Sequence, residues 1–295
     1  MAIETLHSTE IVLPTVTLDS GKKCTATVAM EIVNDDIYCV RTYDPKEGSE
    51  EDGKKQPVVL HKLFNYLSGG NGSSSYVMVR TQAGTENIAV HANSLTYHNH
   101  VFYLVTRNGE GTENQVMAFG SDGIITHKYT YSGGKIGTIN YYDTQNGALR
   151  FLISVKHKVN VLFRLVKISG TKLVDEGVSF EALVSDNNYE TGNDSYYNRS
   201  TKQLYVTKFK NPDQDAGDDA KIVSNLVLQY DLSDGISGTS AKYSSVRTLQ
   251  VDNQEGEMKF EIEGLCMYDN KKYVCVNSLD LNKNQTDAIC KLYLP

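Results

Sequence analysis

The chain has 295 residues, of which 40% are hydrophobic and 22% are charged, a composition typical of a folded protein and atypical of a disordered or fibrous one. Its net charge of −7 at pH 7 would repel a phosphate backbone, which argues against nucleic acid as a partner. The 19 Tyr, 8 Phe and 23 Gly, with no Trp and 5 Pro, favour strands and turns over helices.

The first residues do not have the pattern of a signal peptide. Residues 1–21 contain the acidic Glu4 and Glu10, and they lack both a basic start and an unbroken apolar core. No other stretch is apolar over the length needed to cross a bilayer. We therefore expect synthesis in the cytoplasm, with any release or secretion by a leaderless route.

The cysteines are predicted to be buried free thiols. Four of the five, Cys39, Cys266, Cys275 and Cys290, lie in predicted strands, and Cys24 lies close to one. No CxxC or CxxxC pair offers the spacing of a zinc site. The sequence therefore suggests no metal at the cysteines, and we expect no cofactor.

A hairpin of two apolar strands joined by a polar turn recurs along the chain, which indicates a repeat architecture. The hairpins are predicted at 29–44, 93–109, 139–155, 195–209 and 264–278. Each second strand carries an aromatic residue that we call the anchor: Tyr38, Tyr103, Phe151, Tyr205 and Tyr273. The anchors are 48 to 68 residues apart, which matches one blade of a β-propeller with variable loops, and we expect them to pack between blades.

Each hairpin is followed by a segment with the period-2 alternation of a half-buried strand. These third strands are predicted at 58–64, 115–120, 161–168, 226–232 and 288–294. A more polar segment, typical of an edge strand that faces solvent, follows in the first four repeats at 76–82, 124–131, 172–180 and 243–251. The repeats are thus predicted to be four-stranded antiparallel blades.

The fifth repeat lacks a fourth strand of its own, because the chain ends at Pro295. The β-rich run at 9–18 is predicted to supply that strand by pairing with 288–294, and Pro14 suits an outermost strand. We therefore predict one all-β domain over 1–295, a five-bladed β-propeller whose N-terminal strand closes the last blade. The blades are predicted at about 24–82, 88–131, 135–180, 186–251 and 258–294 with 9–18.

Polar side chains lead into the first strands of several repeats, where they would line a central channel on a ligand-binding face. His91 and Asn93 begin the second hairpin, and Glu261 and Glu263 stand at the same distances from the anchor of the fifth. Asn193 belongs to a similar polar stretch before the fourth hairpin. We predict that these five residues contact a ligand.

Channel carboxylates could also carry out glycoside hydrolysis, with one group as acid and the other as base or nucleophile. The candidate catalytic residues are Glu263 and Asp186. The same groups could bind a ligand without catalysis, or could only hydrogen-bond one another and water. The spacing does not separate a retaining pair from an inverting one, and the sequence favours the interpretations without catalysis.

Two further patterns offer candidate sites. In the loop at 211–221, Asp213, Asp215 and Asp219 outline a calcium loop, but the closing Glu and the flanking helices of an EF-hand are missing, so a solvated acidic loop is favoured and no metal is expected. Exposed tyrosines can stack on a sugar face. The candidates near the first strands are Tyr97, Tyr141, Tyr142, Tyr189, Tyr196 and Tyr197.

Three segments, 91–108, 193–221 and 255–293, resemble in their order and pattern the helveticin J-like class III bacteriocins of lactobacilli. The resemblance implies a bacterial, leaderless protein that acts at the envelope of competing Gram-positive cells, with His91 and Glu263 as functional residues. The absence of Trp departs from that family. The expected function is binding of a cell-surface ligand such as a cell-wall glycan, with bacteriocin-like activity. The alternatives are a glycoside hydrolase or lyase and a protein-binding scaffold.

Overall fold

The computed structural model describes residues 2–43, 57–68, 73–82, 91–107, 114–157, 160–183, 190–210, 224–236, 241–253, 257–280 and 285–293. Every regular element in these ranges is a β-strand, in agreement with the aromatic and turn-rich composition. The same ranges contain no helix of the length and apolarity that crossing a membrane requires. The protein is therefore all-β, as predicted.

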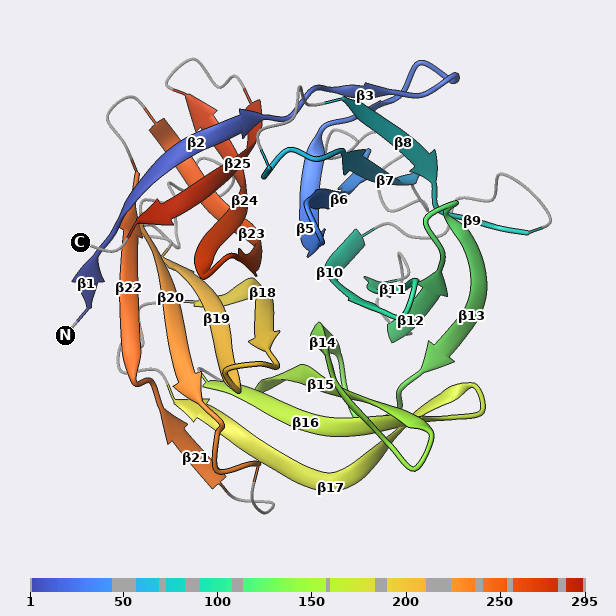
Figure 1. The fold of residues 1–295 in the computed structure, drawn as a ribbon, viewed down its shortest axis with the longest axis vertical. Coiled ribbons are helices and arrows are strands. Elements are labelled where there is room, and N and C mark those ends of the chain that lie inside the picture. The colour runs from blue at the N-terminus through green and yellow to red at the C-terminus, as the bar shows by residue number, and fades with distance from the viewer. Residues whose placement is uncertain are drawn as a thin grey trace.

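Antiparallel pairing groups most strands into four-stranded units that follow one another along the chain (Figure 1). The predicted hairpins form the first two strands of each unit. In chain order the units are β5 (Ala26–Val33), β6 (Asp36–Thr42), β7 (Val58–Leu63) and β8 (Ser74–Met78); β10 (His91–His98), β11 (Val101–Arg107), β12 (Asn114–Phe119) and β13 (Ile124–Thr130); β14 (Ile136–Gln145), β15 (Ala148–His157), β16 (Asn160–Ser169) and β17 (Lys172–Leu183); β18 (Glu190–Asn198), β19 (Gln203–Lys210), β20 (Ser224–Asp231) and β22 (Arg247–Asp252); and β23 (Glu257–Tyr268), β24 (Lys271–Asp280), β25 (Gln285–Tyr293) and β2 (Leu6–Val12).

The first strand of each unit lies closest to the centre of the molecule, and the last strand lies at the rim (Figure 1). We call β5, β10, β14, β18 and β23 the inner strands. They contact one another in this order, and β23 contacts β5, so they surround the centre as a closed ring. This radial arrangement is the one that a propeller prediction requires.

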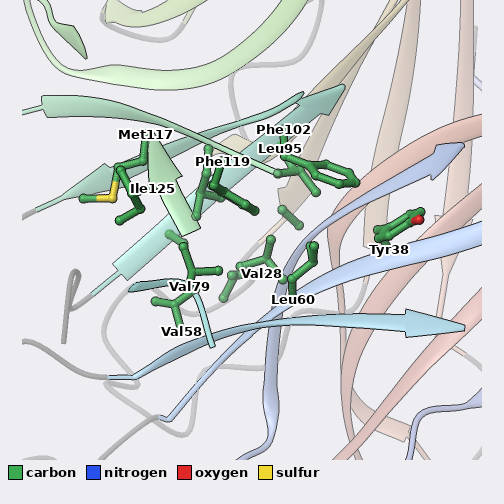
Figure 2. Close-up of a cluster of buried hydrophobic side chains, with 14 residues drawn as sticks. Val28, Tyr38, Val58, Leu60, Val79, Leu95, Phe102, Met117, Phe119 and Ile125 are labelled. Carbon is green, nitrogen blue, oxygen red and sulfur yellow. The ribbon is translucent and has the colours of Figure 1, made fainter. Parts of the chain in front are cut away.

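Hydrophobic clusters fill the spaces between consecutive units. Figure 2 shows the cluster between the first and second units, where the ring centroids of Tyr38 and Phe102 lie 4.8 Å apart. Tyr103 and Phe151 pack at the same distance between the second and third units. All five anchors are buried, so the prediction that they pack between units is confirmed.

The N-terminal strand β2 pairs antiparallel with β25, so the predicted pairing between the two ends of the chain is confirmed. The strand begins earlier than the predicted range 9–18 and ends at Val12. The backbone N–H of Leu13 still donates to the carbonyl of Asp287 at 2.8 Å, but Pro14 has no N–H with which to continue the pairing. The chain then turns into β3 (Val16–Thr17), which pairs with β4 (Lys23–Cys24).

Two rim segments that were predicted as single strands are divided, so those predictions are wrong in detail. Within 76–82, β8 ends at Met78 and β9 (Arg80–Thr81) pairs parallel with β13 of the next unit. Within 243–251, β21 (Ala241–Ser244) pairs parallel with β17 of the preceding unit, and only β22 pairs with β20. A bare rim strand would expose unpaired backbone groups. The short strands cover some of these groups and link neighbouring units.

Two further parallel contacts continue these links along the rim. β1 (Ile3–Glu4) pairs with β22, and Thr130 of β13 pairs with Lys172 of β17. Through this second contact the second and third units form one continuous sheet. Sheet boundaries alone therefore do not mark the units, whereas antiparallel pairing does.

The five cysteines are buried and form no disulfide, as predicted. Burial raises the pKa of the Cys39 thiol to about 12 and that of Cys24 to about 11. These thiols are therefore protonated at neutral pH and are poor nucleophiles.

Candidate functional site

The inner strands carry β-bulges, at which one residue is skipped in the pairing with the second strand. In β10 the bulge lies between Ala92 and Ser94, and in β23 it lies between Ile262 and Gly264. The skipped residues are Asn93 and Glu263. The structural equivalence that the sequence predicted for this pair is thus confirmed.

The predicted ligand contacts on β10 and on β23 lie on strands that are not neighbours, because β5 separates these two strands in the ring, whereas Asn193 belongs to β18, which neighbours β23. Asn93 and Glu261 are buried, and Glu263 is partly exposed. The side chains of His91 and Asn193 lie outside the described residues, as do Asp186 and the acidic loop residues Asp213, Asp215 and Asp219. These sites stay predictions. In the described ranges, no three His, Cys, Asp or Glu side chains cluster closely enough to hold a metal ion.

Side chains on one inner strand accept hydrogen bonds from the backbone of the next. The Ser94 hydroxyl oxygen on β10 accepts one from the N–H of Ile139 on β14 at 3.2 Å. Two residues further along, Thr96 accepts one from the N–H of Tyr141 at 3.1 Å. Because both partners advance together by two residues, neighbouring inner strands run parallel, and their C-terminal ends lie on the same face of the molecule.

The same kind of bond continues around the ring. Asn140 of β14 accepts a hydrogen bond from the N–H of Tyr197 on β18 at 2.9 Å. Asp194 of β18 accepts one from the N–H of Leu265 on β23 at 3.1 Å and a second from the Ser94 hydroxyl at 2.7 Å. These bonds satisfy inward-facing backbone groups that no strand ladder reaches.

Glu31 makes the corresponding bond from β5, and its carboxyl is buried. One oxygen accepts from the N–H of Tyr97 on β10 at 3.1 Å, and the other accepts from the N–H of Ile32 at 3.1 Å and from the Cys266 thiol at 3.5 Å. Burial raises the pKa of Glu31 to about 7, although these hydrogen bonds and the charge of Arg199 lower it. The carboxyl is therefore substantially protonated near neutral pH.

Glu31 lines a pocket of about 240 Å³ that opens toward the C-terminal ends of β5, β10, β14 and β18. This volume lies just below the range of about 300–1,000 Å³ that is typical of small-molecule sites, so it suits a ligand the size of one sugar ring. Four tyrosines and one arginine contribute to the lining: Tyr97, Tyr141, Tyr196, Tyr197 and Arg199.

A stack of planar groups stands beside this pocket. The rings of His98 and Tyr141 are stacked, with centroids 3.7 Å apart and planes 19° apart. The guanidinium of Arg199 lies over the Tyr141 ring at 4.8 Å from its centroid, a cation–π contact. Burial lowers the pKa of His98, and the charge of Arg199 lowers it further. His98 is therefore neutral at pH 7, and Arg199 carries the positive charge of the stack.

Sequence reasoning found part of this pocket. Tyr97, Tyr141, Tyr196 and Tyr197 belong to the six tyrosine candidates, whereas Tyr142 stacks behind Tyr197 at 5.2 Å and Tyr189 lies outside the described residues. Glu31 and Arg199 were missed.

The signal for Glu31 was its position relative to the anchor. The residues that pair with the anchors across the hairpins are Glu31, Thr96, Tyr141, Tyr196 and Cys266. Four of these five line the pocket, and Cys266 donates to Glu31. Comparing these positions among the repeats would have located the site.

No family model and no curated protein matches the chain. Among solved structures, the catalytic domain of the Coprinopsis cinerea GH62 α-L-arabinofuranosidase is similar with a TM-score of 0.54 and 10% identity, over 99% of this chain and 96% of that one. The GH43_1 enzyme from Xanthomonas citri complexed with xylose gives 0.52 and 11%, over 98% and 90%. A glycosyl hydrolase from Bacteroides ovatus gives 0.52 and 10%, over 98% and 91%. The chain thus shares its all-β fold with glycoside hydrolases of propeller architecture.

Proposed function

We propose that the protein is a five-bladed β-propeller that acts on carbohydrate, with the tyrosine-lined pocket as its sugar-binding site and glycoside hydrolysis as its activity. The observation that carries this proposal is Glu31, a buried carboxyl among aromatic rings whose pKa is raised to about 7. A carboxyl of this kind can hold a proton near neutral pH and donate it to a leaving group. The fold shared with glycoside hydrolases supports the same reaction class.

The five-bladed architecture is proposed for the whole chain, 1–295, as a single domain. Its support is the succession of four-stranded antiparallel units, each with its first strand in the central ring. Hydrophobic clusters lie between consecutive units, and the pairing of β2 with β25 completes the last one. Each unit is then one blade.

The pocket chemistry suits a sugar. Tyrosine rings offer flat apolar surface for the C–H groups of a pyranose or furanose ring, and their hydroxyls can hydrogen-bond. Tyr97 and Tyr196 are only partly buried, so they can present such surface to a ligand. Tyr141 and Tyr197 are held in place by hydrogen bonds at their backbone N–H groups. The site is therefore largely formed before a ligand arrives.

In the proposed reaction Glu31 gives its proton to the glycosidic oxygen as the bond from that oxygen to the anomeric carbon breaks. A water molecule supplies the hydroxyl that the anomeric carbon gains, and its remaining proton restores the acid. Asp194 is enclosed, and its oxygens already accept from Leu265 and Ser94, so it does not act on substrate. Glu263 does not line this pocket, so it is not placed to act on the same bond. Asp186, which lies outside the described residues, remains the candidate for the second carboxylate.

Binding without catalysis is a second candidate, because Glu31 is the one carboxyl among the described residues that line the pocket. A bacteriocin-like action on Gram-positive cells, which the resemblance to helveticin J implies, is a separate prediction that nothing in the fold or the comparisons supports. Co-sedimentation of the protein with intact cells, with turbidity recorded in parallel, tests it. A protein-binding scaffold would show no dependence on sugar, neither in co-sedimentation with cells nor in the release of reducing ends.

The experiment for the hydrolase proposal measures release of reducing ends from a panel of polysaccharides that includes the neutral arabinan, xylan and mannan and the acidic polygalacturonate. We expect Glu31→Gln to lose at least about a hundredfold of the rate, because general acid catalysis contributes that much. Glu10→Gln makes the same chemical change on the exposed strand β2 and should keep the rate. Circular dichroism and thermal melting establish that both variants are folded.

Three outcomes separate the candidates. Turnover that is unchanged in a folded Glu31→Gln variant would rule out Glu31 as the acid. If no polysaccharide is cleaved but calorimetry detects sugar binding that depends on Tyr97, the non-catalytic candidate is correct. Absence of both turnover and binding would refute a carbohydrate function at this pocket.

A further inference from the structure

Arg199 is a positive charge at the pocket without a negative partner among the described residues. It follows β18 in the turn toward β19, it is exposed, and its guanidinium rests on the ring of Tyr141. Within the described part of the chain, no Asp or Glu carboxylate lies within the 4.0 Å of an ion pair with it. Elsewhere on the molecule arginines do have such partners, as Arg150 does with Asp143 and Glu176.

The charge of Arg199 acts on the groups that form the pocket. Burial raises the pKa of Glu31, Tyr196 and Tyr197, and the charge of Arg199 offsets part of that rise. Burial lowers the pKa of His98, and the charge of Arg199 lowers it further. Glu31 does not neutralise it by direct contact, because the two side chains form no ion pair within 4.0 Å. With Glu31 protonated, the pocket lining has one net positive charge, although the whole chain has a charge of −7.

The described residues accept no hydrogen bond from the Arg199 guanidinium, so its N–H groups are available to a ligand. A planar guanidinium can donate two parallel hydrogen bonds to one carboxylate. The cation–π contact with the Tyr141 ring favours this position of the exposed side chain, which reduces the entropy lost when an anion binds.

We propose that the pocket selects an acidic sugar, such as a uronic acid residue, and that Arg199 binds its carboxylate while the tyrosine rings hold the sugar ring. The inference rests on the proposed carbohydrate function and adds to it the substrate class and the residue that determines specificity. A neutral sugar would leave the guanidinium without an anion. An acidic sugar would neutralise it and would add charge-assisted hydrogen bonds.

Matched sugars test this most directly. Trigalacturonate and galactotriose with the same linkage differ only in the C6 group of each ring, which is a carboxylate in the first sugar and a hydroxymethyl group in the second. Their binding is measured by calorimetry at pH 6 and low salt. We expect the acidic trisaccharide to bind at least about tenfold more tightly, because a hydrogen bond to a charged group contributes roughly that factor. Added NaCl should weaken binding of the acidic sugar and leave that of the neutral sugar unchanged.

Variants in the turn between β18 and β19 test whether Arg199 causes the preference for the acidic sugar. Arg199→Gln should remove the preference for the acidic sugar, and Arg199→Lys should restore part of it, because lysine keeps the charge but loses the planar fork. Lys202→Gln removes the same charge three residues away, on an exposed side chain that does not line the pocket, and should keep the preference.

The outcomes distinguish this inference from the proposed function. Equal or tighter binding of galactotriose by the native protein would overturn the acidic-sugar inference and leave a sugar-binding pocket intact. A preference that survives in Arg199→Gln, or that disappears equally in Lys202→Gln, would overturn the role of Arg199. Failure of both sugars, and of a wider panel of neutral and acidic oligosaccharides, would instead refute the proposed function.

Discussion

Arg41 is buried where the first and last units of the ring meet, and its replacement should open that seam. The side chain lies on β6 and is 1% exposed, and its Nη2 lies 3.0 Å from Oδ2 of Asp287 on β25. The same carboxylate oxygen accepts from the N–H and the hydroxyl of Thr27 at 2.9 and 2.8 Å. Arg41 also donates to the carbonyl oxygens of Pro14 and Thr25. One guanidinium thus connects β6, β25 and the segment that follows β2.

We expect Arg41→Met to lower the free energy of unfolding by about 3–5 kcal/mol, because it leaves Asp287 as a buried charge without its partner. Methionine fills part of the vacated volume, so lost packing is the smaller part of the effect. Removing both charges in Arg41→Met with Asp287→Leu should recover much of the loss, since no unpaired charge is then buried.

The loss should also depend on pH. Burial raises the pKa of Asp287 above its usual 3.8, while Arg41 lowers it, so Arg41→Met should raise it further. Over the range between the unfolded and folded pKa, the native state holds more protons than the unfolded state, and stability therefore falls as pH rises. In Arg41→Met the pH range between the unfolded and folded pKa of Asp287 is wider, so the variant should lose more stability than the native protein as pH rises. The difference in free energy of unfolding between the native protein and Arg41→Met is thus expected to be smaller near pH 5 than at pH 8.

Guanidinium chloride unfolding at pH 5 and pH 8, followed by circular dichroism, measures these differences. A loss below about 1 kcal/mol at pH 8 would refute the reasoning, because the seam would then hold without the ion pair. A double variant that is less stable than Arg41→Met would contradict the assignment of the loss to an unpaired Asp287.

Three further predictions concern the core, the site and the chain end. Phe102→Ala should cost about 3–5 kcal/mol in chemical unfolding, because the ring is 1% exposed in the cluster shown in Figure 2; a loss under about 1 kcal/mol would contradict that packing. Burial raises the pKa of Glu31 from 4.5 to about 7, so protons bind the native state preferentially, and this group should make stability fall by on the order of 3 kcal/mol as pH rises from 4.5 to 7. Thermal melts of Glu31→Gln should lack that part of the fall, and identical pH profiles would exclude the shift. Deletion of residues 1–12 removes β2 and leaves the edge of β25 unpaired, so we expect cooperative melting to be lost; an unchanged melting curve would show that the closing strand is dispensable.

The hairpins could be predicted because their turns are local. Asn34, Asn99, Asn146 and Asp269 all adopt positive φ angles between 47° and 56° at the turns between first and second strands. Asparagine and aspartate tolerate this conformation, and two-residue turns of this kind match the twist of the flanking strands. Polar turn residues between two apolar runs therefore specified the pairing before any long-range contact was known.

The rim could not be predicted in the same way, because its pairing partners are distant in sequence. Tyr243 and Val251 belong to one alternating stretch, yet β21 pairs with β17 and β22 pairs with β20. The period-2 pattern reports only that a residue lies in a half-buried strand. Which neighbouring sheet it joins depends on how adjacent units meet at the rim.

The site was predicted in part for a related reason. The polar residues that the sequence marks as ligand contacts, such as Asn93 and Glu263, lie at the beginnings of the first strands, and the pocket lies toward the ends of those strands. Four residues separate Asn93 from Tyr97, a distance of roughly 13 Å along the strand. The alternation of β5 marks Glu31 only as an acidic residue within an apolar run. Its role depends on the ring of inner strands, which no single repeat reveals.

That ring also bears on why a carboxyl occupies position 31. Thr96 stands at the same distance from its anchor and accepts a hydrogen bond from the next inner strand with an uncharged hydroxyl. Glu31 makes the equivalent bond to Tyr97, but burial of its carboxyl is unfavourable for the charged form and raises its pKa to about 7. The fold therefore needs only a hydroxyl or an amide at this place. A protonatable group at the pocket wall is what proton transfer to a bound glycoside requires, and the Glu31→Gln variant separates that requirement from the structural bond.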